Sequence, residues 1–86
     1  MQVLIAFDST HHALRGEQIL LQAGLAIDII PTPREITASC GLTLCLPAAD
    51  LEQATILLCE GGVDYREIYY LTTQQGTKSY RLREGT

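Results

Sequence analysis

Four short apolar runs, separated by two segments of helical periodicity, place the strongest constraint on the fold of this chain. The runs cover residues 2–7, 25–30, 42–46 and 63–71. Gln2–Phe7 has almost no polar alternation, which is typical of a central strand. Asp28 interrupts the second run and indicates an edge strand with one wet side. In the third run, the leucines of Leu42–Leu46 should face the core, while Thr43 and Cys45 point the other way.

The first helical segment is expected from His11 to Ala23. Asp8-Ser9-Thr10 supplies side chains that cap a helix N-terminus, and Gly24 stands where a C-terminal glycine is expected. At about 100° per residue, one face gathers small and apolar residues suited to packing on a sheet, namely Ala13, Gly16, Ile19, Leu20 and Ala23. Leu14 and Leu21 lie roughly opposite, either as the flank of a wide core stripe or as a second stripe for a partner subunit.

The second half of the chain repeats this order of helix and strand. A helix is expected from Ala48 to Glu60, because Pro47 suits a first helical turn and Gly61-Gly62 ends the periodic pattern. Its predicted buried residues are Leu51, Ala54 and Leu58. Val63–Leu71 then reads as a fourth strand, and it is rich in tyrosine.

The resulting order, β-α-β-β-α-β, is typical of the split βαβ or ferredoxin-like pattern of the α+β class. We expect an antiparallel sheet in the strand order 4-1-3-2, with two helices on one face. Residues 1–71 should form this domain. Residues 72–86 are either a C-terminal tail or an added strand, in which a turn at Gln75-Gly76 would return residues 78–82 onto the fourth strand.

Charge and cysteine usage narrow the classes of partner and compartment. The chain has 86 residues and a formal net charge of -4, which suits one small domain and disfavours nucleic acid as a partner. Its longest apolar run is far shorter than the ~20 residues that span a membrane, so we expect no membrane partner. The 3 cysteines include no C-x-x-C pair, and no signal peptide precedes the first strand. Reduced thiols and a cytoplasmic location are therefore predicted.

The stretch Pro31–Gly41 resembles a core element less than any other part of the chain. It holds two of the 3 prolines and places Cys40 directly before a glycine. In the predicted strand order the third strand lies beside the first, so Cys40 should face the Asp8–His12 turn. A helix N-terminus there offers unpaired N–H donors and partial positive charge, both of which favour a thiolate. A charged Arg34 would add to this effect.

Other residues near that turn have weaker expected roles. His11 or His12 would supply a further donor, and Asp8 would oppose the thiolate if it lay close. Gly41 would allow close approach of the backbone and an unusual φ. No metal site is expected, because adjacent histidines on a helix point about 100° apart and cannot both bind one ion.

Each cysteine also has a purely structural interpretation. An isolated cysteine is commonly a small buried hydrophobe, and this alternative stays open for Cys40. Cys45 within a strand and Cys59 near the end of a helix are expected to be structural. A Cys40–Cys45 disulfide is not expected, because five extended residues span far more than the ~7 Å limit on the Cα separation.

Three groups of residues resemble the Putative Se/S (selenium/sulfur) carrier protein-like family. They are Ser9-Thr10 with Ala13-Leu14 and Glu17, then Pro31-Thr32-Pro33-Arg34-Glu35-Ile36, then Ser39-Cys40-Gly41. The resemblance covers about residues 3–70. It implies that Cys40 is the carrier residue and that Arg34, Ser39 and Gly41 shape its site. We add Ser9, Thr10 and His11, at the expected helix start, as binding residues.

The expected function is therefore a carrier that holds sulfur or selenium on the Cys40 thiolate as a persulfide-type species. It would pass the chalcogen to an acceptor protein, as one component of a relay rather than as a stand-alone catalyst. Donor and acceptor proteins are the implied partners, and no resident cofactor is implied. Two alternatives stay open: a protein-binding or regulatory module, and a single-cysteine redox partner. A homo-oligomer formed through Leu14 and Leu21, or through the tyrosine-rich fourth strand, is also compatible with the pattern.

Overall fold

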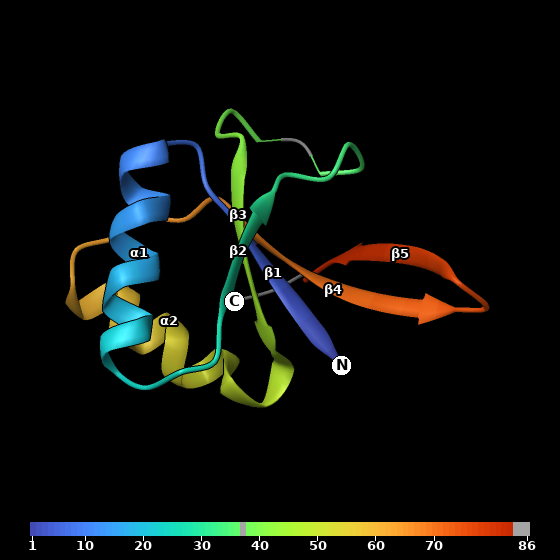
Figure 1. Cartoon of the computed structure of the whole chain (residues 1–86). Helices are drawn as coiled ribbons and strands as arrows, with labels where there is room; N and C mark the ends of the chain where they lie inside the picture. The colour runs from blue at the N-terminus through green and yellow to red at the C-terminus, as the bar shows by residue number, and fades with distance from the viewer. Residues whose placement is uncertain (37, 84–86) are drawn as a thin grey trace.

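The computed structural model describes residues 1–36 and 38–83, and this part forms a five-stranded antiparallel sheet with two α-helices (Figure 1). The strands are β1 (Gln2–Ala6), β2 (Asp28–Pro31), β3 (Leu42–Pro47), β4 (Glu67–Gln74) and β5 (Thr77–Leu82). The helices are α1 (Thr10–Gln22) and α2 (Leu51–Glu60), and a 3-10 turn, η1 (Ala48–Asp50), leads into α2. The α+β class is thus confirmed.

Strand β1 lies at the centre of the sheet, whose order is β2-β3-β1-β4-β5. Ile5 stands opposite Leu44 of β3 on one side and Ile68 of β4 on the other. This confirms the central strand predicted from the first apolar run. The described sheet has five strands, so its order departs from the four-stranded ferredoxin-like pattern by the added β5. β2 forms an edge, as Asp28 indicated.

Both helices cover the same face of the sheet (Figure 1). The core between them and the sheet is built from large, fully buried side chains, chiefly Val3, Ile5, Phe7, Leu20, Leu44 and Leu58. Gly16 lets α1 approach α2 closely, because a Cβ at Gly16 would lie only 3.1 Å from Cδ2 of Leu58 on α2. Ala23, by contrast, is exposed, because it is the C-cap residue beyond the last buried turn of α1.

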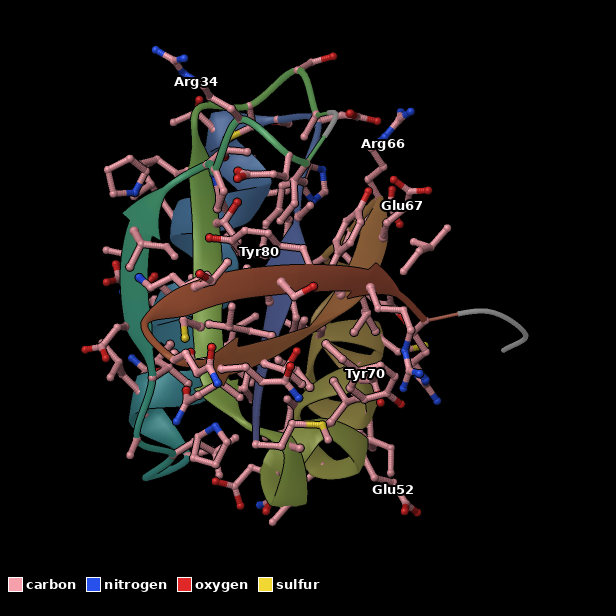
Figure 2. All side chains as sticks on the ribbon, turned by 90° about the vertical axis from the view of Figure 1, so that its right-hand side faces the viewer. Arg34, Glu52, Arg66, Glu67, Tyr70 and Tyr80 are labelled. Atoms are coloured by element: carbon pink, nitrogen blue, oxygen red, sulfur yellow. The ribbon has the colours of Figure 1, made fainter. Side chains whose placement is uncertain are left out.

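The opposite face of the sheet carries a second apolar cluster. Its buried members are Leu4, Ala6, Ile36 and Tyr69, and Cys45 and Tyr80 pack against them. The β4–β5 hairpin points away from the helices and crosses this face (Figures 1 and 2). Thr43 and Cys45 do face away from the helices as predicted, and Thr43 is fully buried there. Both faces of the sheet are therefore covered.

Several predicted boundaries are wrong by a few residues. The second strand begins at Asp28, because Leu25 and Ile27 instead pack on the helix-side core. The fourth strand begins at Glu67. The buried Val63 instead follows α2, and its N–H closes the end of that helix by donating to the Leu58 carbonyl. The domain division at residue 71 stays a prediction, and β4 runs across that position. Residue 37 and residues 84–86 lie outside the described part.

Candidate functional site

Cys40 faces the start of α1, as predicted from the pairing of β1 with β3. Its N–H donates to the carbonyl of Phe7 at 3.2 Å, which ties it to the end of β1. The Cys40 sulfur lies 3.6 Å from Oγ1 of Thr10, the first residue of α1. Ser9 caps that helix by accepting from the N–H of His12. Cys40 is only 3% exposed, however, so the polar surroundings of the loop do not make its thiol accessible.

Two groups that can donate a hydrogen bond lie beside the Cys40 sulfur. The backbone N–H of Leu42 donates to Sγ at 3.3 Å, and the Thr10 hydroxyl lies within hydrogen-bonding reach. Hydrogen bonds from N–H and O–H groups favour negative charge on the atom that accepts them. The Leu42 amide could not be identified from the sequence, because a backbone group leaves no residue signature.

A second set of hydrogen bonds holds the chain on either side of Cys40. Thr32 donates from its hydroxyl to the Cys40 carbonyl at 2.9 Å, and its N–H donates to the Gly41 carbonyl at 2.9 Å. The Thr32 hydroxyl also lies 2.9 Å from that of Thr43. In the sequence, the only sign that Thr32 would hold the chain beside Cys40 was its position between two prolines. Thr32 thus links the end of β2 to the residues that precede β3.

Two expectations about the surroundings of Cys40 are wrong. Arg34 is exposed and its side chain points away from the body of the molecule, so it does not place its charge on the sulfur (Figure 2). Gly41 needs neither an unusual φ nor a close approach, because a Cβ there would meet nothing within 4 Å. His11 is exposed, whereas the Nδ1 atom of His12 accepts from the Asp64 N–H at 3.0 Å.

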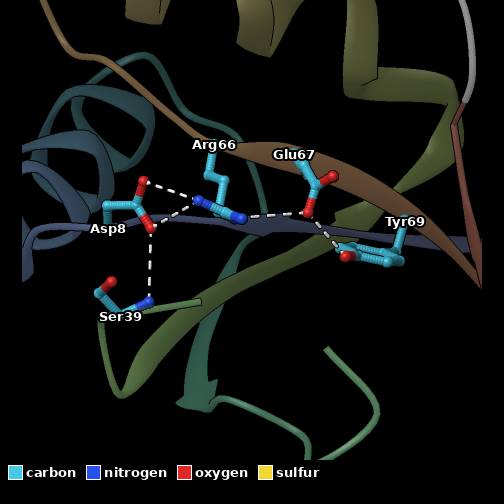
Figure 3. Close-up of polar contacts among 5 residues, drawn as sticks. All are labelled: Asp8, Ser39, Arg66, Glu67 and Tyr69. Atoms are coloured by element: carbon cyan, nitrogen blue, oxygen red, sulfur yellow. Dashed lines mark hydrogen bonds and ion pairs between the residues drawn. The ribbon is translucent and has the colours of Figure 1, made fainter. Parts of the chain in front are cut away.

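Sequence reasoning missed an ion-pair network beside Cys40 (Figure 3). Oδ1 of Asp8 accepts the N–H of Ser39 at 3.4 Å, and Oδ2 lies 3.2 Å from Nη1 of Arg66. Nε of Arg66 lies 3.5 Å from Glu67, which accepts the hydroxyl of Tyr69 at 2.8 Å. The hydrogen bond and charge of Asp8 raise the pKa of Arg66. Arg66 therefore compensates the Asp8 charge that would oppose a thiolate.

The other two cysteines lie away from this network, and all three thiols are free. Cys45 donates to Oε1 of Gln2 at 3.2 Å, and burial, followed by the charge of Asp28, raises the pKa of this thiol. Cys59 is exposed on α2. Across the described residues, no group of three His, Cys, Asp or Glu side chains is arranged to hold a metal ion. Neither helix there is long and apolar enough to cross a membrane.

The surfaces proposed for self-association differ in exposure. Leu14 and Leu21 on α1 are 49% and 50% exposed, so they are not the flank of a core stripe. Of the tyrosines in the predicted fourth strand, Tyr69 is buried and Tyr70 half-buried, and Tyr65 precedes β4. Contact with a partner through either surface stays a prediction.

Comparison with protein-family models gives one match. The model described as "Putative Se/S carrier protein-like" matches residues 2–70, which include β1, the Cys40 site and the first part of β4. Searches of curated proteins and of solved structures gave no match. Because the match covers most of the chain and the whole neighbourhood of Cys40, the chain belongs to the Putative Se/S carrier protein-like family.

Proposed function

We propose that this protein carries sulfur or selenium on Cys40 and passes it between two other proteins. The Cys40 thiolate attacks the outer sulfur of a persulfide on a donor cysteine. The donor S–S bond breaks, the donor cysteine leaves as a thiolate, and Cys40 becomes a persulfide. An acceptor nucleophile then attacks the outer sulfur, the new S–S bond breaks, and the Cys40 thiolate returns. Selenium follows the same steps with Se in place of the outer sulfur, and neither transfer needs an external oxidant.

The observation that carries this proposal is the pair of donors at the Cys40 sulfur. The Leu42 N–H lies 3.3 Å and the Thr10 hydroxyl 3.6 Å from Sγ, where both stabilise an attacking or leaving thiolate. The first turn of α1 adds N–H groups without intrahelical partners and the positive end of the helix dipole. Among the described residues, neither the Cys45 sulfur nor the Cys59 sulfur accepts a hydrogen bond, and Cys45 instead donates to Gln2. The family match, over residues 2–70, includes Cys40.

Burial of Cys40 places one requirement on the mechanism. At 3% exposure the sulfur cannot meet a second cysteine in line for attack, so residues 38–41, the Cys40 segment, must move during transfer. While closed, the segment would slow the attack of water and of small thiols on a bound persulfide. Partner proteins that open the segment would then exchange sulfur with Cys40 faster than small molecules do. Free thiols fit a reducing compartment, and we assign the relay to the cytoplasm.

Loading with a small-molecule persulfide tests the proposal. The reduced protein is incubated with this reagent, and the modified residue is located by intact-mass and peptide mass spectrometry. We expect an addition of about 32 Da per sulfur at Cys40 that a thiol reductant removes. Protein isolated from selenium-fed cells should carry the corresponding adduct of about 80 Da. Cys40→Ser should abolish both additions, whereas Cys59→Ser should leave them in place.

Cys59 is the matched control because it is exposed, and its sulfur makes no hydrogen bond to any other described residue. Loading of Cys59 in preference to Cys40 would contradict the proposal. A mixed disulfide at Cys40 in protein isolated from cells, without any persulfide, would instead support a single-cysteine redox partner.

A further inference from the structure

Access to Cys40 depends on what holds the Cys40 segment (residues 38–41) in place. We propose that Asp8 is a positioning residue that keeps this segment closed over the sulfur, and that its release admits the sulfur donor. The inference rests on the proposed carrier function, because only a residue that must meet a partner needs controlled access. It adds a role for Asp8 and Arg66 that the carrier function alone does not include.

Asp8 is placed to join two parts of the chain that are far apart in sequence. One carboxylate accepts from the N–H of Ser39, directly before Cys40, and also faces Nη1 of Arg66 at 3.2 and 3.4 Å (Figure 3). Arg66 is itself anchored, because its N–H donates to the Ala6 carbonyl at 2.7 Å. The Arg66 guanidinium therefore holds the Asp8 carboxylate in position, and that carboxylate holds Ser39.

The contacts that Asp8 makes with Ser39 and Arg66 are weak, which suits a closed segment that opens easily. The Asp8 and Arg66 side chains are 51% and 40% exposed, so solvent weakens their attraction. The hydrogen bond from Ser39, at 3.4 Å, is long. A partner that presents its own charged group to either side chain could therefore displace the pair. The contacts deeper in the segment, from Cys40 to Phe7 and from Thr32 to Cys40, are shorter and more enclosed.

Alkylation of Cys40 by the uncharged reagent iodoacetamide measures this closure. Both other cysteines are replaced by serine, so that only Cys40 reacts. Because solvent weakens this exposed ion pair, Asp8→Ala should accelerate alkylation by only about two- to fivefold. Arg66→Met should act in the same direction. The double variant should be no faster than Asp8→Ala alone, since both changes release the same Ser39 contact.

A control variant separates this effect from a general change of surface charge. Glu52→Gln removes one negative charge from α2, far from Arg66 in the structure (Figure 2), and should leave the rate unchanged. The helix cap is also spared, because Ser9 rather than Asp8 accepts from the first turn of α1. Salt provides a readout that a purely structural role would not affect. Added salt should accelerate alkylation of the parent protein and have no such effect on Asp8→Ala.

The outcomes are distinct from those of the persulfide test. An unchanged alkylation rate in Asp8→Ala, or a rate that rises only as far as the variant loses thermal stability, overturns the role of Asp8 and leaves the carrier proposal standing. Suppose instead that Asp8→Ala is alkylated faster than the parent protein and without a salt effect, but that Cys40 never carries a persulfide. The closure by Asp8 would then be real and the carrier function wrong.

Discussion

Among the described residues, Thr43 is the polar residue whose side chain is buried. Its hydrogen bonding shows how the chain next to Cys40 is held in place. It is fully buried on the face of the sheet opposite the helices. Its hydroxyl lies 2.9 Å from that of Thr32, which in turn donates to the Cys40 carbonyl. A buried hydroxyl without a partner is costly, so Thr32 satisfies Thr43 and fixes the segment beside it.

Thr32→Val should therefore destabilise the fold by about 1–3 kcal/mol, because it leaves the Thr43 hydroxyl buried without a partner. Thr43→Val should cost less, since Thr32 keeps its bond to the Cys40 carbonyl. The double variant should be more stable than the sum of the two changes predicts. Urea unfolding of the four proteins measures this, and strict additivity would refute the pairing.

The β4–β5 hairpin is the element that the sequence left most open, and its turn explains why it forms. Gln75 and Gly76 have φ values of 53° and 81°, the positive pair that matches the twist of a two-residue hairpin. Glycine adopts such a φ without the cost that a Cβ imposes. The turn returns β5 so that Tyr80 stands opposite Leu71 and packs on the second cluster.

Gly76→Ala should destabilise the hairpin by about 1–2 kcal/mol, because alanine at a φ of 81° is strained. Gly41→Ala is the matched control, since its Cβ would meet nothing within 4 Å and its φ is not positive. Thermal unfolding should show a lower Tm for the first variant only. Amide exchange should be faster across β5 in that variant, and equal effects of both substitutions would contradict the assignment of the turn.

The described part of the molecule is a sheet covered on both faces, by two helices on one side and by the hairpin with Ile36 and Ala38 on the other. This arrangement assigns opposite roles to neighbouring leucines of α1. Leu20 is fully buried against the sheet, whereas Leu21 is 50% exposed. The stability of the fold therefore depends on one face of α1, and the other face is open to contact with other molecules.

Leu20→Ala should cost about 2–5 kcal/mol, because it opens a cavity in the helix-side core. Leu21→Ala removes the same atoms from an exposed site and should change the stability by no more than about 0.5 kcal/mol. Chemical denaturation of the two variants, measured at several protein concentrations, provides the comparison. A large, concentration-dependent loss for Leu21→Ala would instead show that this face is buried in an oligomer.

Much of the fold could be predicted from the sequence, because its signals act over a few residues. Ser9 and Gly24 bound α1, apolar alternation set the faces of β3, and Gln75-Gly76 marked a turn. The boundaries of β2 and β4 were less predictable. Apolar residues such as Val63 look alike in the sequence whether they pair in a strand or close the end of a helix.

For the candidate site, the order of helices and strands in the sequence was enough to predict that Cys40 lies beside the first turn of α1. The burial of Cys40, the outward direction of Arg34 and the link that Asp8 makes between Ser39 and Arg66 are seen only in the folded chain. These contacts cross 31 and 58 positions of the chain. They depend on how the strands and loops pack together, and no pattern of neighbouring residues encodes a pairing over such separations.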